Sequence, residues 1–191
     1  MPYSKDPQKG YFDLTALSFK DDGTNGWTLT TVNGFIYLTA TSTNALKQVI
    51  AIVHPNHNLD LGLATAASGA FFHLHWTHAT VSPTGVIIIT VKARAGKPNQ
   101  GFVTLTPLVF TLTPTAGNID SNTITELAVP ADWYPYLTVD AIWNILIERN
   151  RGANAGDTFA NPCYLFAADL HVLGSGKMTT AKDIGTGWVN T

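Results

Sequence analysis

The sequence has 191 residues, with 11 basic and 13 acidic side chains and a formal net charge of −2. Charged residues make up 13% of the chain, against about 25% in an ordinary globular protein. The charges are spread without long runs of one sign, which argues against a surface for nucleic acid or an anionic membrane. The single cysteine, Cys163, excludes an intramolecular disulfide framework, and we expect its thiol to be buried in a strand.

The low charge content also means that few charged side chains are available to keep the surface soluble. We expect part of it to be covered by other subunits, because a monomer with so few charges would be poorly soluble. The alternative is a surface kept soluble by hydroxyl groups, which the 26 threonines could supply. Residues 1–7 are polar and the longest apolar runs, such as residues 86–91, are too short to span a bilayer. We therefore expect the protein to be made as a soluble intracellular product without a membrane partner.

In chain order, residues 1–26 are polar and rich in glycine and aspartate, and we expect an extended N-terminal arm there. A single domain is predicted over residues 27–191. Runs of β-branched and aromatic residues predict strands at residues 27–32, 35–39, 86–91 and 103–106. Residues 43–53 have a helix-like apolar spacing, but residues 49–53 also fit a buried strand, which we favour.

Turns and prolines complete the pattern. Turn signals recur at Asp22-Gly23, Asn25-Gly26, Asn33-Gly34, Pro83-Thr84-Gly85 and Pro98-Asn99-Gln100-Gly101. Pro107 and Pro114 predict either an edge strand or two strands with a break between residues 103 and 113. The sequence therefore predicts an all-β fold, an antiparallel β-sandwich that is jelly-roll-like and has few or no helices.

Three histidines are candidate metal ligands. His73 and His75 are two residues apart, so they lie on the same face of a strand, and His171 is the third candidate. His78 falls on the opposite face of a regular strand. We favour histidines that are hydrogen-bonded within a sheet or at a subunit interface, without a metal or cofactor. Convergence with His54 and His57, which lie in a polar loop, would favour a metal site instead.

Catalytic motifs are weak. The His-x-His pair is similar to the first motif of cupins, but those proteins place a glutamate where this chain has Ala79 and Thr80. The sequence contains no Gly-x-Ser-x-Gly elbow. Five carboxylates are candidates by type only: Asp132, Asp140, Glu148, Asp157 and Asp169. Glu148 is more readily a strand-end ion pair with Arg149 and Arg151, and Asp157 a turn residue. We predict that the protein is not an enzyme.

Aromatic residues suggest a binding surface. Trp133, Tyr134 and Tyr136 lie within four residues, and three rings at this density could form a platform that stacks on sugars. The alternative is a loop that packs against the sheet or against a neighbouring protomer.

The order of several short motifs resembles that of a family of small structural proteins in tailed-phage virions. The matching features are the strand with His73, His75 and Trp76, the strand ending at Arg149, the turn Gly156-Asp157-Thr158-Phe159, Asp169-Leu170-His171, and Leu173-Gly174-Ser175. They span roughly residues 54–180. The chain departs from the family where Phe72 replaces a proline that usually precedes the first histidine, and residues 103–130 have no clear counterpart.

The resemblance implies a virion protein that is synthesised in the host cytoplasm and works by binding. It implies a structural signature of His73, His75, Trp76, Arg149, Asp157, Asp169 and His171. Its partners would be itself, as a homotrimer or another cyclic oligomer, and the major capsid protein or another virion protein. Our first choice is a capsid decoration or cement protein that binds and stabilises the assembled shell. The alternatives are a tail-fibre or head-fibre module that binds host-surface glycans and a cupin-like metal-dependent enzyme.

Overall fold

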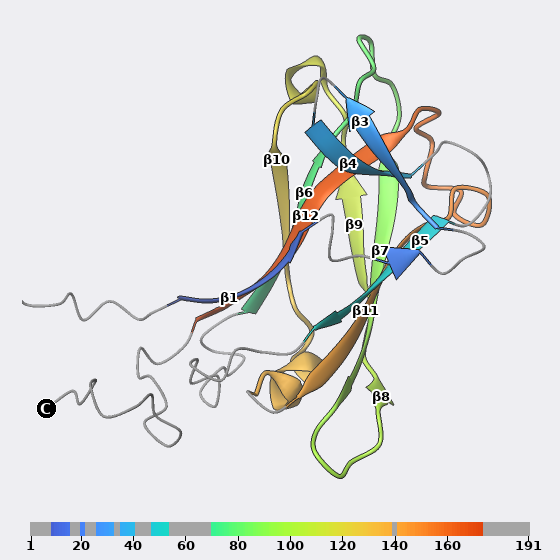
Figure 1. Ribbon diagram of the computed structural model, residues 1–191. Coiled ribbons are helices and arrows are strands. Elements are labelled where there is room, and N and C mark those ends of the chain that lie inside the picture. The colour runs from blue at the N-terminus through green and yellow to red at the C-terminus, as the bar shows by residue number, and fades with distance from the viewer. Residues whose placement is uncertain are drawn as a thin grey trace, which may run out of the picture.

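The computed structural model describes residues 9–15, 20–21, 26–32, 35–40, 47–53, 70–138 and 141–173 (Figure 1). The strands are β1 (Lys9–Thr15), β2 (Lys20–Asp21), β3 (Thr28–Val32), β4 (Phe35–Ala40), β5 (Lys47–Val53), β6 (Ala70–Thr77), β7 (Ile87–Gly96), β8 (Val103–Thr104), β9 (Leu108–Leu112), β10 (Thr123–Ala128), β11 (Ile142–Arg149) and β12 (Cys163–Leu173). Within the described ranges, the short 3-10 helices η2 (Ala116–Asn118) and η3 (Ala131–Tyr136) lie between strands.

The strands form two antiparallel sheets. Sheet A has the order β10-β6-β12-β4-β3, and β1 pairs with the C-terminal part of β12. Sheet B has the order β2-β5-β11-β7-β8, and β9 also pairs with β7. From β9 onward the chain alternates between the sheets, because β9 and β11 lie in sheet B and β10 and β12 in sheet A. This is the jelly-roll-like β-sandwich that the sequence predicts.

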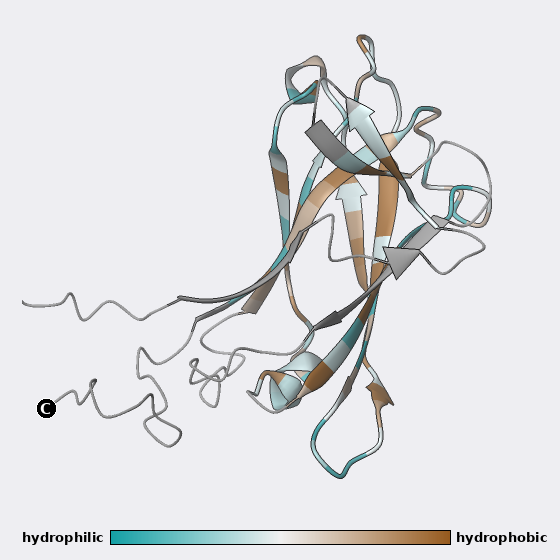
Figure 2. Cartoon of the chain, viewed as in Figure 1, coloured by the Kyte–Doolittle hydropathy of each residue, from teal (hydrophilic) through white to brown (hydrophobic). Residues whose placement is uncertain are grey.

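The core lies between the two sheets and follows from the two-residue period of each strand. The inward side chains come mainly from four strands and η3: Phe72, Leu74, Trp76, Ile87, Ile89, Val91, Trp133, Trp143, Ile145, Ile147, Leu165 and Leu170. Strongly hydrophobic segments accordingly alternate with polar ones along β7 and β12 (Figure 2). Cys163 is buried in this core, as expected, and burial raises the pKa of its thiol to about 12.

Most predicted strands are confirmed. Residues 47–53 form strand β5 and not a helix, and Pro107 separates β8 from β9, as the two-strand alternative predicted. Gly85 lies in a predicted turn and has φ +96°, a conformation that L side chains rarely adopt. A Cβ there would meet the backbone of Thr158 at 2.9 Å.

Two segments of the expected N-terminal arm are strands. Lys9–Thr15 pairs with β12 over seven register positions, and Lys20–Asp21 pairs with β5. These two segments are therefore strands of the sandwich, because the main-chain groups of both sheets pair with them. Among the described residues no helix has the length and apolar character needed to cross a membrane.

Candidate functional site

Three adjacent strands bring histidines and carboxylates together on the outer face of sheet A. The register pairs His73 of β6 with Asp169 of β12 on one side and with Glu126 of β10 on the other. Directly paired residues of an antiparallel sheet lie on the same face. His73 and His75 alternate with the buried Phe72, Leu74 and Trp76, so they point away from the core.

A β-bulge sets the orientation of the β12 residues. The pairing of β6 with β12 shifts register between Leu165 and Ala167. Leu165 points into the core, and after the bulge the inward positions are Ala168 and Leu170. A regular strand would continue inward at odd-numbered positions, whereas the extra residue moves Asp169 and His171 to the outer face.

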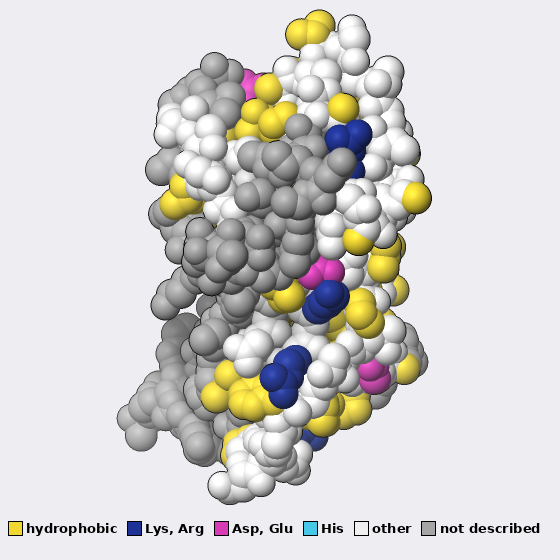
Figure 3. Space-filling model, turned by 90° about the vertical axis from the view of Figure 1, so that its right-hand side faces the viewer, with side chains coloured by type: hydrophobic (Ala, Val, Ile, Leu, Met, Phe, Trp, Pro, Cys, Tyr) yellow, Lys and Arg dark blue, Asp and Glu magenta, His cyan; other side chains and the backbone are white. Residues whose placement is uncertain are grey.

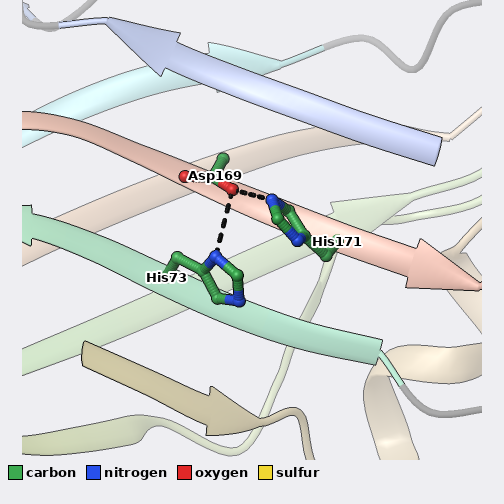
Figure 4. Close-up of side chains that lie close together, drawn as sticks. All are labelled: His73, Asp169 and His171. Atoms are coloured by element: carbon green, nitrogen blue, oxygen red, sulfur yellow. Dashed lines mark ion pairs between the residues drawn. The ribbon is translucent and has the colours of Figure 1, made fainter. Parts of the chain in front are cut away.

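Asp169 is the centre of the cluster. Its Oδ1 accepts a hydrogen bond from His75 Nε2 at 2.7 Å, and its Oδ2 lies 3.4 Å from His73 Nδ1. The Nε2 atom of His171 forms an ion pair with the same Oδ2 (Figure 4). The Asp169 side chain is almost fully buried, although it lies on the outer face, because the imidazole rings surround it.

The two rings nearest to Asp169 Oδ2 lie in contact, with their planes tilted by 51°. The centroids of His73 and His171 are 3.8 Å apart, and both rings direct a nitrogen toward the carboxylate (Figure 4). One ligand atom from each of His73, Asp169 and His171 lies within 4.8 Å of the others. Burial lowers the pKa of His171; Asp169 opposes this shift and His73 adds to it.

Two further residues hold the cluster from the outside. His73 Nε2 lies 2.5 Å from Oε2 of Glu126, and His75 Nδ1 lies 3.1 Å from Oδ1 of Asn122. Sequence reasoning missed both residues, because nothing in the local pattern of residues 122–126 says which strand is their neighbour. The alternation of threonine with Ile124 and Glu126 was the available signal for a strand.

His78 has a separate, structural role, as its predicted position on the other face implied. Its side chain is buried, its Nε2 lies 2.9 Å from the carbonyl oxygen of Thr115, and its Nδ1 accepts a hydrogen bond from the Thr80 main chain. His54 and His57 lie outside the described residues, as does Gly174-Ser175 of the C-terminal motif.

The other residues of the predicted structural signature lie inside the sandwich. Trp76 is a core residue whose Nε1 donates to Oγ1 of Thr125. Arg149 occupies an inward position at the end of β11, and its guanidinium donates to both oxygens of Asp157, at 2.8 Å each. The guanidinium also donates to the carbonyl oxygens of Phe159 and Asn161. Arg149 therefore fixes the loop between β11 and β12.

These contacts correct two sequence-based assignments. Glu148 does not pair with Arg149 but with Lys92 of β7, at 2.6 Å, because neighbouring residues of a strand point to opposite faces. Asp157 is more than a turn residue, since it is buried, pairs with Arg149 and accepts a hydrogen bond from the Ile88 main chain. Asp132 accepts one from the Thr106 main chain, and Asp140 lies outside the described residues.

The three aromatic residues of the predicted platform all lie in η3 but differ in burial. Trp133 is fully buried, donates from Nε1 to the carbonyl of Thr106 and packs edge-on against Phe72. Its ring faces are not accessible to a sugar, so the prediction that Trp133 belongs to a sugar-binding platform is wrong. Tyr134 and Tyr136 are partly buried against the core, and the Tyr134 hydroxyl accepts a hydrogen bond from the Ala70 main chain.

Solved structures are similar to this chain at low sequence identity, but the comparisons show no family. No family model and no curated protein matches the chain. Among solved structures, the CBM22-2 xylan-binding domain from Paenibacillus barcinonensis Xyn10C superimposes with a TM-score of 0.41 and 10% identity, over 84% of this chain and 98% of that one.

Of two further similar structures, one is a xylan-binding module and the other is viral. The xylan-binding module CBM15 has a TM-score of 0.39 and 8% identity, over 88% of this chain and 94% of that one. A structure of the infectious bursal disease virus Gt strain has a TM-score of 0.34 and 9% identity, over 90% of this chain and 33% of that one. At this level of similarity the superpositions assign no function to the chain.

Proposed function

We propose that the protein is a non-catalytic structural protein of a phage virion that binds the assembled capsid shell and stabilises it. The observation that carries this proposal is the absence of charge on two edge strands of the described sheets. Strand β3 at the edge of sheet A and strand β9 at the edge of sheet B contain no charged residue. Soluble proteins usually protect such edges with charges, because an edge strand can pair with another chain.

Exposed apolar side chains support the same conclusion. Leu29 of β3 is 53% exposed and Val109 of β9 is 54% exposed. Phe102 and Val103 add apolar surface beside β7. Among the described atoms of the face shown in Figure 3, hydrophobic side chains lie between uncharged groups, and charged side chains are scattered singly. A surface of this kind is suited to lasting contact with other protein subunits.

The side-chain chemistry of the described residues supports a role without catalysis. The imidazoles of His73, His75 and His78 contact carboxylate, amide or main-chain groups. A histidine that activates a nucleophile would instead contact a hydroxyl or a thiol. Cys163 is buried with a raised pKa, which disfavours the reactive thiolate. The motifs shared with phage virion proteins serve partly to build the core, as the Arg149 contacts illustrate.

A capsid-binding assay tests the proposal. Purified protein is added to expanded capsids that lack it, and separately to unassembled capsid protein, and co-sedimentation is measured. We expect saturable binding to the capsids and none to the free subunits, because a decoration protein bridges neighbouring subunits of the shell. Light scattering should give a homotrimer of the 20.5 kDa chain. Equal binding to free subunits, or no binding to capsids, would contradict the proposal.

Copy number in purified phage particles separates the alternatives. A ratio to the major capsid protein near one, or a simple fraction of it, fits a shell protein. A few to a few dozen copies would favour the tail-fibre or head-fibre module, whose glycan contacts would involve Tyr134 and Tyr136 but not the buried Trp133. Absence from the particle would favour the cupin-like enzyme.

A further inference from the structure

We infer that His73, Asp169 and His171 form a binding site for one divalent transition-metal ion, with Zn²⁺ as the best-suited probe. This inference is independent of the proposed role in a virion. It rests on four features of the outer face of sheet A: the donor atoms, their convergence, the groups that hold them, and the electrostatics at Asp169 Oδ2.

The donor set is appropriate for such an ion. Two imidazole nitrogens and one carboxylate oxygen are ligands that zinc and related first-row metals accept in proteins. Calcium and magnesium prefer sites built from oxygen alone. The three donor atoms lie within 4.8 Å of one another, so small side-chain adjustments bring them onto one ion. Their strands are rigidly paired, since His73 and Asp169 are direct register partners.

The second layer of contacts matches that of a metal site. A metal-bound histidine usually donates its remaining ring N–H to a carboxylate, which orients the ring and makes it a stronger ligand. His73 has this arrangement, because its Nε2 lies 2.5 Å from Glu126 while its Nδ1 faces Asp169. The other oxygen of Asp169 accepts a hydrogen bond from His75 at 2.7 Å, which leaves Oδ2 directed at His73 and His171.

The electrostatics of the cluster favour a bound cation. In one neutral tautomer of His73, Nε2 bears the hydrogen and donates it to Glu126. Nδ1 then has a lone pair directed at Asp169 Oδ2, 3.4 Å away. Two hydrogen-bond acceptors, His73 Nδ1 and the largely buried Asp169 Oδ2, then lie opposite each other and repel. A cation shared by Nδ1, Oδ2 and the nitrogen of His171 converts this repulsion into attraction.

The cluster is only partly enclosed, which provides a route for the ion. The side chain of His171 is 28% exposed, whereas that of Asp169 is 8% exposed. Three protein ligands leave at least one coordination position of a tetrahedral ion for water or for a further ligand. Bound there, the ion joins β6 to β12 through side chains as well as through the main-chain ladder.

The test is metal binding by the full chain, purified without a polyhistidine tag and treated with chelator. Titration calorimetry with Zn²⁺ should give one ion per chain, and Co²⁺ should give the visible absorption of a low-symmetry nitrogen and oxygen site. Asp169→Asn and His171→Gln should each abolish stoichiometric binding. Glu126→Gln should weaken it by about 10- to 100-fold, as outer-layer substitutions do.

Matched controls separate a site from adventitious binding. Asp132→Asn makes the same chemical change at an exposed carboxylate on η3, and it should leave Zn²⁺ affinity unchanged. Zn²⁺ should raise the unfolding temperature of the wild type and of Asp132→Asn but not of His171→Gln. If Asp169→Asn fails to fold, His171→Gln decides the matter. Absence of stoichiometric Zn²⁺ binding to the wild type, or undiminished binding to a folded His171→Gln, would overturn the inference.

Discussion

Arg149 and Asp157 form a buried ion pair in which the guanidinium Nε and Nη2 each donate to a different carboxylate oxygen at 2.8 Å. Both side chains are almost completely inaccessible to solvent. The bidentate geometry and the extra donation to the Phe159 carbonyl offset the cost of removing two charges from water. The pair links the end of β11 to the loop before β12, which places the first residues of that strand.

We expect Arg149→Met to reduce the free energy of unfolding by about 3 to 5 kcal/mol, because it leaves the Asp157 carboxylate buried without a counter-charge, with only the Ile88 main-chain donor beside it. Urea unfolding followed by circular dichroism measures the change. Lys92→Met is the matched control, since it removes a half-exposed cation from the pair with Glu148, whose side chain is 12% exposed, and should cost at most about 1 kcal/mol. Equal costs for the two variants would show that burial does not decide the contribution of the pair.

Gly85→Ala should destabilise the protein by more than about 1 kcal/mol, because the new Cβ meets the Thr158 main chain and φ is positive. The control is Gly101→Ala, where a Cβ meets nothing within 4 Å and φ is not positive. That variant should stay within about 0.5 kcal/mol of the wild type. Thermal unfolding of the three proteins compares them, and a fully stable Gly85→Ala would refute the close approach of the two loops.

Cys163 should make stability depend on pH in the alkaline range. Burial raises the pKa of its thiol from 9.0 to about 12, so between these values the unfolded chain loses the proton while the folded chain keeps it. This contribution to stability is complete below pH 9 and falls as pH rises, by up to about 1.4 kcal/mol per pH unit. Urea midpoints at pH 8 and pH 10 should therefore fall more in the wild type than in Cys163→Ala. Parallel decreases would indicate an accessible thiol.

Val109→Lys tests whether the β9 edge is used in binding. The side chain is more than half exposed, so the substitution should leave the unfolding temperature nearly unchanged. A charge on an edge strand discourages pairing with another chain, and we expect weaker capsid binding or loss of the trimer. Thr111→Lys, on the same outer side of β9, shows whether the effect extends along the strand. Unaltered assembly in both variants would remove β9 from the interface.

The fold class was largely predictable because strands and turns have local sequence signals. Runs of β-branched residues and turn signals located β3, β4, β7 and β8, and the prolines located the break before β9. The strand β1 was not predicted although it contains the strand-forming types Tyr11, Phe12 and Leu14, because its pairing with β12 is a long-range property.

The candidate site was predictable in part. His73 and His75 could be placed on one face from their spacing, and His171 was a candidate by type. The sequence could not show that β6 lies between β10 and β12, so the contributions of Glu126 and of Asp169 as the central acceptor were not predictable. Trp133 was misplaced because a ring in a short 3-10 turn has no periodicity to indicate which way it points.

The bulge in β12 has a consequence for how the gene can change. Deleting one residue between Leu165 and Asp169 would restore a regular strand and exchange the two faces of everything that follows. The carboxylate and imidazole would then enter the hydrophobic interior, while Leu170 would be expelled to the surface. We therefore expect relatives that keep the cluster to align across these few positions without gaps.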